Sequence, residues 1–364
     1  MVMTVVSRGG REWLLTERIG AGSEGMVYAV GHGGSLVAKL VPDPADPVAF
    51  RRRVERLVRQ RREPRAVRLL AGAPQRVAWP LAAVRVLRAG IEGYLMPDLR
   101  RDFLPFTALL TPAGRRDALP GTTWTTGLAA AGALARLLAD LHAEGYVVGD
   151  LNPDNLWADA QGRVGMADVD SWQFTDGRDT FPGRMRTSGY TAPERMSPGP
   201  GPGPPAGEGV TGTGPRERRT PVAPAVPPDE STDVFALAVL VHQLLMGGLH
   251  PFAGHPADGA YLSLDDNVLH GRCRLLDRTS VVLPRSAPPA DLLPRALDTL
   301  LRAAFDGGPR PPAAVWAEEL AAARAPERIT VCVERTTHVH TVERPWCPWC
   351  DQARRGTDSY PERA

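Results

Sequence analysis

Lysine is almost absent from this chain. Lys39 is the only lysine among 43 Lys and Arg side chains, so arginine carries nearly all of the positive charge. A compact ammonium on a flexible stem suits a site between phosphate oxygens better than the planar fork of arginine does. Lys39 also stands twelve residues after Val27, the last residue of a glycine-rich run. This placement favours nucleotide phosphates over the alternative that one lysine simply survived a GC-rich coding bias.

Long apolar runs, cysteine and net charge are also scarce. No stretch approaches the roughly 18 apolar residues of a membrane span, and residues 1–11 lack the basic and apolar regions of a secretion signal. The formal net charge of +2 produces no global field that recruits nucleic acid, and the basic run 51–68 is typical of a solvated helix face. Four cysteines are too few for a disulfide scaffold, and Cys273 reads as a small buried hydrophobe. We therefore expect a cytoplasmic protein with no membrane and no nucleic-acid partner.

The chain divides into a strand-rich first part and a helical second part. Between residues 12 and 96, short apolar runs alternate with turns around a single helical stretch, residues 47–62. Residues 97–325 form the larger, mainly helical part. The whole chain is 43% apolar, which is sufficient for a packed core.

Two helices of the second part are predicted from their apolar pattern. Residues 127–143 carry leucines at three- and four-residue spacing, which indicates one core-facing side. Residues 233–246 are apolar nearly all round, which predicts a fully buried helix. Ser231 or Thr232 is available as the cap of this second helix.

Three further segments are distinguished by composition. Residues 197–228 are dominated by Pro and Gly, which cannot bury enough surface to offset the entropy of ordering, so we expect a disordered insertion. A segment with Cys and His, residues 330–351, closes the fold. Residues 352–364 are expected to be a disordered tail.

A glycine-rich turn carries the first chemical signal. Gly20, Gly22 and Gly25 lie between two strand-like runs, and Lys39 follows in the next strand-like run. A dinucleotide-binding fingerprint would need a strand, a loop and then a helix. The context therefore favours a hairpin that covers phosphates.

Two carboxylate motifs follow more than a hundred residues later. Asp150 is followed five residues on by the amide of Asn155, and Asp168 stands at the end of the apolar run 164–167. A carboxylate that accepts a proton, together with an amide and a carboxylate that bind magnesium, is the set that phosphoryl transfer requires.

These motifs, in this order, resemble the eukaryotic-type protein kinase family over residues 12–325. The resemblance implies an α+β, bilobal fold with a small β-rich N-lobe (12–96) and a mainly helical C-lobe (97–325). It implies that Asp150 accepts the proton of the attacking hydroxyl and that Asn155 and Asp168 hold Mg²⁺. The residues around ATP would be Gly20, Gly22, Gly25, Val27, Lys39, Glu55, Met96, Asp98, Asn155 and Asp168.

Several of these roles rest on the resemblance alone. Glu55, on the predicted helix, is the expected ion-pair partner of Lys39, with Glu63 as the alternative and a plain surface glutamate as a further one. Residues 93–99 resemble the hinge that receives adenine, and Met96 is the expected gatekeeper. A bare strand end is the alternative for this run.

The resemblance extends to the segment that holds a peptide substrate. Thr187 would be the threonine associated with serine/threonine substrates, and Glu194, in the Ala-Pro-Glu motif, would pair with Arg310. Asp233 resembles the aspartate that braces the catalytic-loop backbone. As a plain helix cap it would be unremarkable.

Three positions depart from the family pattern. Gly149 replaces the arginine that usually precedes the catalytic aspartate, so we expect little dependence on activation-loop phosphorylation. Asn152 replaces a lysine that steadies the γ-phosphate, so transfer is expected to be slow. Asp170 replaces the glycine of Asp-Phe-Gly, and either reaches a second metal or, as we favour, hydrogen-bonds locally.

The last cysteines suit a metal better than a disulfide. Cys347 and Cys350 form a CxxC turn, and Cys332 with a histidine would complete a closed tetrahedral site for structural Zn²⁺. We favour His338 over His340 because it fits the pattern of the bacterial kinase-like proteins with a C-terminal zinc-binding tail, which this segment resembles. Free cysteines and redox use of the CxxC turn are the alternatives.

The short motifs at residues 78–80, 168–171 and 347–350 resemble a narrower group of bacterial kinase-like proteins with a C-terminal zinc-binding tail. That group is found with von Willebrand A-domain proteins and metal-dependent phosphatases in stress-response modules. The leading hypothesis is an ATP- and Mg²⁺-dependent serine/threonine protein kinase in bacterial signalling or stress response. A nucleotide-binding pseudokinase scaffold that docks partners through its zinc tail is the second. A small-molecule phosphotransferase is the third, and the glycine-rich loop and the Ala-Pro-Glu segment argue against it.

Overall fold

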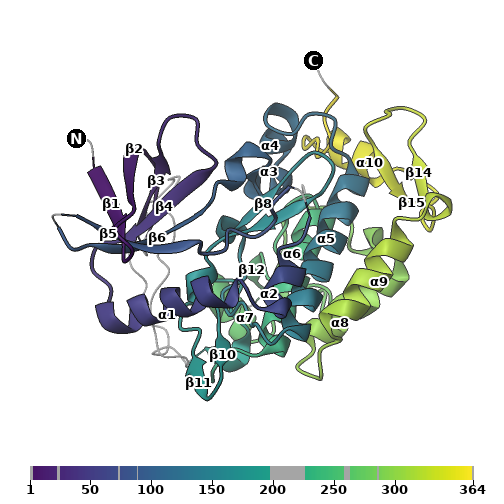
Figure 1. The fold of residues 1–364 in the computed structure, drawn as a ribbon. Helices are drawn as coiled ribbons and strands as arrows, with labels where there is room; N and C mark the ends of the chain where they lie inside the picture. The colour runs from purple at the N-terminus through teal and green to yellow at the C-terminus, as the bar shows by residue number, and fades with distance from the viewer. Residues whose placement is uncertain are drawn as a thin grey trace, which may run out of the picture.

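Two lobes make up the computed structural model, a small sheet-rich one at the N-terminal end and a larger helical one (Figure 1). The predicted insertion 197–228 lies, apart from its last three residues, outside the described residues. None of the helices within the described part of the chain combines the length and apolarity needed to cross a membrane. The structure describes residues 3–22, 25–72, 74–87, 89–196, 226–257, 263–284 and 287–362.

A closed barrel of six strands forms the small lobe, in the order β1-β2-β3-β4-β6-β5. Alternate residues such as Leu15, Leu40 and Leu95 fill its interior and are almost fully buried. The barrel begins earlier than the predicted boundary at residue 12, because β1 pairs with both β2 and β5 and so closes the sheet. The strands are β1 (Met3–Ser7), β2 (Glu12–Gly22), β3 (Gly25–Val30), β4 (Leu36–Val41), β5 (Ala82–Val86) and β6 (Glu92–Pro97).

Two helices follow β4, where the sequence predicted a single one. Helix α1 (Pro47–Gln60) begins at Asp46, whose carboxylate accepts hydrogen bonds from the backbone N–H groups of residues 48 and 49. A separate helix, α2 (Pro64–Leu69), starts at Pro64. The proline forces Glu63 into an extended conformation, with ψ of 147°, and this breaks the helical run.

Helices α5 and α6 form the core of the large lobe. The predicted helix 127–143 is part of α5 (Trp124–Ala143), which ends before Gly145, a residue with φ of +77°. The remaining helices are α3 (Thr107–Leu110), α4 (Pro112–Asp117), α6 (Glu230–Leu245), α7 (Leu264–Leu269), α8 (Arg295–Phe305) and α9 (Ala313–Ala323). Short strands complete the lobe: β7 (Leu104–Pro105), β8 (Leu156–Ala158), β9 (Val164–Met166), β10 (Phe174–Asp176), β11 (Asp179–Phe181), β12 (His255–Pro256) and β13 (Val281–Val282).

Helix α6 is buried along almost its whole length, as its all-round apolarity predicted. Its N-cap, however, is Asp229 and not Ser231 or Thr232. The Asp229 carboxylate accepts a hydrogen bond from the Thr232 N–H at 2.8 Å, and the Thr232 hydroxyl lies 3.0 Å from the Asp229 N–H. This reciprocal capping box satisfies two backbone donors at once, which neither alternative cap provides.

Residues 329–362 pack on the large lobe beside α5 and α9 (Figure 1). They form β14 (Ile329–Val331), β15 (Val339–Thr341) and α10 (Pro348–Arg354). The predicted disordered tail is instead packed as far as residue 362. Tyr360 is buried against Trp349 with ring centroids 4.8 Å apart, and Arg115 donates to the Ser359 carbonyl at 2.7 Å.

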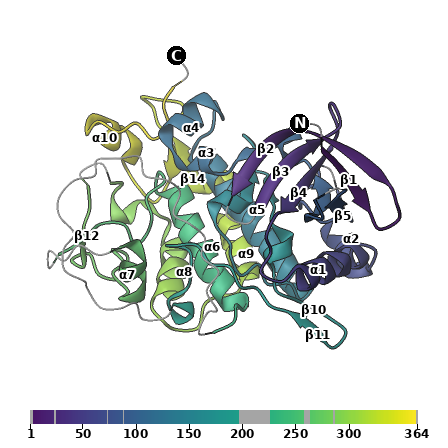
Figure 2. The same ribbon diagram turned by 90° about the vertical axis from the view of Figure 1, so that its left-hand side faces the viewer.

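Helix α1 is joined to the β10–β11 hairpin by its arginines (Figure 2). Arg53 donates to the backbone carbonyls of Asp170, Trp172 and Pro182, with the first two at 3.1 and 2.6 Å. The neighbouring ion pairs are Arg52 with Asp179, and Arg56 and Arg59 with Asp176. The basic run 51–68 is therefore not simply a solvated helix face, because one side of α1 binds the segment that follows Asp168.

We expect Arg53→Met to lower the free energy of unfolding by roughly 2 kcal/mol, because charged hydrogen bonds to three carbonyls are lost while the aliphatic stem is kept. Amide hydrogen exchange in residues 174–181 should also accelerate. Urea titration and exchange mass spectrometry measure the two effects. Arg62→Met, at an exposed position two residues after α1, is the matched control. Equal behaviour of the two variants would contradict the role of Arg53.

Candidate functional site

Lys39 lies in a buried cluster with two aspartates. Its Nζ donates to both carboxylate oxygens of Asp170, at 2.8 and 3.1 Å, and to Oδ1 of Asp168. All three residues are less than 10% exposed. Lys39 comes from β4, whereas Asp168 and Asp170 come from the turn that follows β9. The cluster therefore joins the two lobes.

Tyr94 completes this cluster from the neighbouring strand. It stands directly opposite Lys39 in the β4–β6 ladder, and its hydroxyl donates to Asp170 Oδ1 at 2.6 Å. Burial and the adjacent Asp170 charge raise the pKa of Tyr94 well above its ordinary value. Tyr94 therefore stays protonated at neutral pH and holds one oxygen of Asp170 in place.

The backbone at Asp168 is strained. Its φ of 65° and ψ of 35° are left-handed, and it is the only non-glycine residue with positive φ among those that the structure describes. Such a conformation costs of order 1 kcal/mol and persists where surrounding contacts hold it. Here the Ser171 hydroxyl and N–H both donate to the Asp168 carbonyl, at 2.8 and 3.0 Å. With this backbone conformation, Asp168 directs its carboxylate toward Lys39.

Asp150 lies in a loop that two amides hold in shape. Nδ2 of Asn152 and Nδ2 of Asn155 both donate to the Asp150 carbonyl, at 2.9 and 3.1 Å. The Thr187 hydroxyl donates to Asp150 Oδ1 at 2.8 Å. The carboxylate is thus positioned from both sides, by its own loop and by the segment before the Ala-Pro-Glu motif.

Asp233 braces the same loop from below. Its two oxygens accept hydrogen bonds from the backbone N–H groups of Val148 and Gly149, both at 2.7 Å, and Oδ2 lies 3.0 Å from His142 Nε2. It is not a helix cap, because α6 is capped at Asp229. This is the bracing role that the family resemblance implied.

Arg195 is a structural residue that the sequence analysis missed. It is 2% exposed and donates to the carbonyls of Gly149 and Met185, and so ties the segment after Ala-Pro-Glu to the loop that contains Asp150. Gly149 has φ of +73°, and a Cβ there would lie 3.1 Å from the Pro228 ring. The only sequence signal for Arg195 was that it directly follows Ala-Pro-Glu.

The glycine-rich turn is the tip of the β2–β3 hairpin. Gly22 pairs with Gly25, Gly20 pairs with Val27, and Val27 lies opposite Lys39 on the next strand. A Cβ at Gly25 would lie 2.3 Å from the Leu40 carbonyl oxygen, so only glycine fits there. Ser23 and Glu24, at the tip, lie outside the described residues.

Met96, near the end of β6, and Asp98, just after it, are residues that the sequence led us to expect around ATP. Met96 is buried in an apolar cluster, against which the half-buried Ile19, Val27 and Ala167 pack. These side chains come from both lobes. The Asp98 carboxylate accepts hydrogen bonds from its neighbour Arg100, which outweigh the effect of burial and lower its pKa.

Glu55 is not the partner of Lys39 in this structure. Its carboxylate lies 3.5 Å from Arg8, and its side chain is 39% exposed. The alternative, Glu63, pairs with Arg65 at 3.0 Å. The physical reason is that Asp168 and Asp170 together already supply the buried ammonium with three carboxylate oxygens. The prediction that Asp170 bonds only locally is wrong for the same reason.

Glu194 and Arg310 form the predicted ion pair, with Nη2 lying 3.1 Å from Oε2. Nη1 of Arg310 also bonds Glu194 and lies 3.1 Å from the Ser231 hydroxyl. Although burial favours the neutral acid, the hydrogen bonds from Arg310 prevail and lower the pKa of Glu194. This pair confirms the long-range contact expected across 116 residues of sequence.

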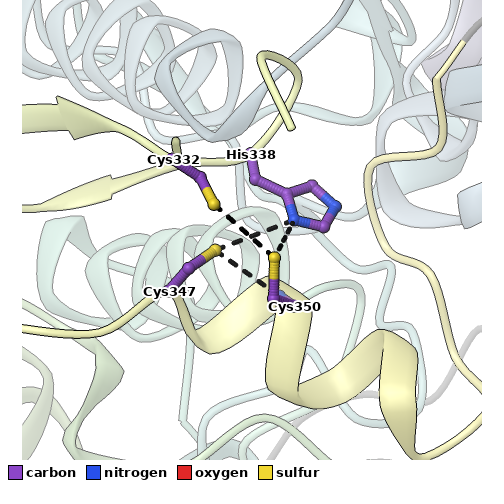
Figure 3. A group of neighbouring side chains, drawn as sticks. All are labelled: Cys332, His338, Cys347 and Cys350. Carbon is purple, nitrogen blue, oxygen red and sulfur yellow. Dashed lines mark hydrogen bonds between the residues drawn. The ribbon is translucent and has the colours of Figure 1, made fainter. Parts of the chain in front are cut away.

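Three cysteines and one histidine converge near the C-terminal end (Figure 3). The ligand atoms of Cys332, His338, Cys347 and Cys350 all lie within 4.8 Å of one another. His338 Nδ1 is 3.3 Å from the Cys350 sulfur and 3.7 Å from the Cys347 sulfur. The alternative, His340, instead has Nδ1 3.0 Å from the Thr341 carbonyl. The donor set of three sulfurs and one imidazole fits a tetrahedral zinc site.

A second layer of contacts surrounds this cluster. His338 Nε2 lies 3.4 Å from Asp358 Oδ1, the arrangement by which a carboxylate fixes the tautomer of a ligating histidine. The Cys350 N–H donates to the Cys347 sulfur at 3.4 Å, and the indole of Trp349 donates to the Val339 carbonyl at 2.7 Å. Asp358 thus contacts the cysteine and histidine cluster, a role that the composition of the tail did not indicate.

Comparisons with known proteins find protein kinases. Two curated relatives, both named protein kinase YegI, are 26% identical to this chain: one from Escherichia coli K12, over 97% of this chain and 50% of its own length, the other from Escherichia coli O157:H7, over 93% and 48%. The chain therefore spans about half the length of the curated relatives that it matches. No protein-family model matches it. A Toxoplasma gondii specific rhoptry antigen kinase domain superposes with a TM-score of 0.50 and 17% identity, over 89% of this chain and 86% of that domain. The chain has a protein-kinase-like fold.

Acidification is expected to destabilise the fold through His250, which bonds the Gly189 carbonyl at 3.0 Å just before Ala-Pro-Glu. Burial lowers the pKa of His250 to about 4, from 6.5. Between these values the unfolded chain binds the additional proton, so stability is full above pH 6.5 and falls as the pH drops toward 4, by roughly 3 kcal/mol at most.

Urea titrations at pH 7 and pH 5 test this, with His250→Gln expected to lose less stability between the two than the wild type. The same substitution at the exposed His270 controls for the loss of a histidine. An unchanged pH dependence in His250→Gln would contradict the assignment.

Proposed function

We propose that this chain is an ATP- and Mg²⁺-dependent serine/threonine protein kinase that transfers the γ-phosphoryl group to a protein hydroxyl. The observation that carries the proposal is the meeting of Lys39 with Asp168 in one buried cluster, beside the loop in which Asn155 binds the Asp150 backbone. The curated relatives named as protein kinases support the same reaction class.

Asp150 is the base of this proposal. Its carboxylate would accept the proton of the substrate hydroxyl, and the amides of Asn152 and Asn155 keep its backbone fixed while it does so. Thr187, which donates to one of its oxygens, leaves the carboxylate oriented for a hydroxyl of serine or threonine. This contact supports serine and threonine as the proposed substrate class.

The nucleotide would be held by residues of both lobes. Lys39 would bind the α- and β-phosphates under the β2–β3 hairpin, and Met96 would lie beside the adenine. Asn155 and Asp168 would hold Mg²⁺, because the Asn155 bond to Asp150 uses its Nδ2 and not the oxygen that a hard cation prefers. Bound magnesium neutralises charge that develops on the transferred phosphoryl group.

Asn152 favours a second function, a nucleotide-binding pseudokinase scaffold. Its side chain is 1% exposed, its Nδ2 donates to the Asp150 carbonyl, and its Oδ1 accepts from the Asp154 N–H. Both polar ends of the amide are used inside the loop. Because an amide is also neutral, no positive charge reaches the γ-phosphate from this position. A scaffold of this kind would bind ATP without transferring phosphate.

A phosphate-transfer assay separates the two functions. With labelled ATP, Mg²⁺ and a generic protein substrate, Asp150→Asn and Lys39→Met should lower transfer at least about 100-fold. Asp154→Asn changes an exposed carboxylate of the same loop and is the matched control. ATP that raises the melting temperature of wild type without any transfer would support the scaffold instead.

We also propose that Cys332, His338, Cys347 and Cys350 hold a structural Zn²⁺. Four ligands fill a tetrahedral site, so the ion would have no open position for chemistry. The site would fasten β14 and β15 to α10 at the edge of the large lobe. The expected partners, a von Willebrand A-domain protein and a phosphatase in bacterial signalling, belong to this proposal through the narrower family resemblance.

The zinc proposal predicts one zinc per purified chain by mass-spectrometric metal analysis. His338→Gln should lose most of the metal and lower the melting temperature, because a ligand is removed. His340→Gln, two residues away and equally buried, should retain the metal and is the matched control. Equal zinc content in the two variants would exclude His338 as a ligand.

A further inference from the structure

Position 170 is one of the three at which this chain departs from the family pattern, and its side chain contacts Lys39. Both oxygens of Asp170 accept hydrogen bonds from the Lys39 ammonium, at 2.8 and 3.1 Å. The Tyr94 hydroxyl holds one of these oxygens at 2.6 Å, and Arg53 donates to the Asp170 backbone carbonyl at 3.1 Å. The side chain is 9% exposed and therefore built into the site.

Helix α1 does not supply the carboxylate that the family resemblance led us to expect. Its buried side chains, among the described residues, are Val54, Leu57 and Gln60. Val54 packs in the same apolar cluster as Tyr94 and Met96, whereas Glu55 points to Arg8 near the surface. The face of α1 that lies toward the lysine is thus apolar.

We infer that Asp170 is the positioning residue for Lys39 and takes the part that the family gives to a helix glutamate. The inference rests on the proposed nucleotide site and identifies how its lysine is anchored. Because Asp168 and Asp170 belong to one turn, the distance between the phosphate-binding lysine and the metal-binding aspartate is set locally. Helix α1 contributes to this turn through Arg53, which donates to the Asp170 backbone carbonyl, and not through a carboxylate on Lys39.

Charge balance gives Asp170 a further use. Asp168 both bonds Lys39 and is the aspartate that would bind a cation. When Asp168 turns to another ligand, Lys39 keeps the carboxylate of Asp170, so the buried ammonium is never left without a counter-charge. Tyr94 keeps Asp170 oriented throughout, since its proton is retained at neutral pH.

The solitude of Lys39 permits a direct test without nucleotide. Protein grown on lysine labelled with ¹⁵N at Nζ contains one labelled side chain, so its ammonium gives one side-chain signal by NMR. We expect Asp170→Asn to shift this signal and to speed the exchange of its protons with water. Glu55→Gln should leave both unchanged. A signal that moves in Glu55→Gln and not in Asp170→Asn would overturn the inference.

Binding calorimetry with Mg²⁺-ATP extends the test to the ligand. Asp170→Asn should weaken binding by about tenfold, Asp170→Glu should recover part of the loss, and Glu55→Gln should stay within about twofold of wild type. Recovery by the longer carboxylate distinguishes positioning from a purely structural effect, and Asp170→Glu also serves if Asp170→Asn fails to fold. Weakening in Glu55→Gln comparable to that in Asp170→Asn would contradict the inference.

The outcomes separate this inference from the proposed function. A wild-type protein that transfers no phosphate, in which the ammonium signal still responds to Asp170→Asn and not to Glu55→Gln, would overturn the proposed kinase activity and support the anchoring role. Phosphate transfer in the wild type, with an ammonium signal that does not change in Asp170→Asn, would support the kinase activity and overturn the anchoring role.

Discussion

The ion pairs of Lys39 with Asp168 and Asp170 are the interaction on which the rest of the site depends. The lysine comes from a strand of the barrel and the aspartates from a turn of the large lobe, so the pairs join the two lobes. Removing three charged groups from water is costly, and it is offset only where every charge has a close partner. The Tyr94 hydroxyl and the Arg53 bond to the Asp170 backbone supply the remaining contacts. The backbone of Asp168 keeps its strained left-handed conformation because the contact of its carboxylate with Lys39 compensates for the strain.

Arginine and lysine divide the work in this chain. Arg53, Arg115 and Arg195 each donate to two or more backbone carbonyls and so fasten segments that are distant in sequence. A planar fork with several donors suits that task, because one side chain satisfies several acceptors at fixed angles. Lys39, a compact ammonium, is kept where a single positive charge must meet several oxygens at one point.

Each departure from the kinase pattern has a local physical explanation. Gly149 adopts φ of +73°, and a Cβ there would lie 3.1 Å from the Pro228 ring, so a side chain would be strained and crowded. Arg195 binds the Gly149 carbonyl and so joins the loop that contains Asp150 to the segment around Ala-Pro-Glu. Asn152 holds the loop through its amide, and Asp170 anchors the lysine. The three substitutions alter how the site is assembled and leave Asp150 and Asp168, the proposed base and the proposed magnesium ligand, in place.

Local sequence determined the elements and the order of the motifs. The all-round apolarity of α6, the glycine hairpin, the ion pair of Glu194 with Arg310 and the set of cysteines with His338 followed from spacing and family pattern, because each depends on residue type more than on precise placement. Tertiary structure alone decided which carboxylate meets Lys39. Glu55 and Asp170 are both acidic residues, so residue type does not distinguish them. In the structure, Val54 is buried in the same apolar cluster as Tyr94, whereas Glu55 lies near the surface beside Arg8 and Asp170 contacts Lys39. The same holds for the tail, where Tyr360 finds a buried position against Trp349 that composition could not indicate, since burial depends on a partner far along the chain.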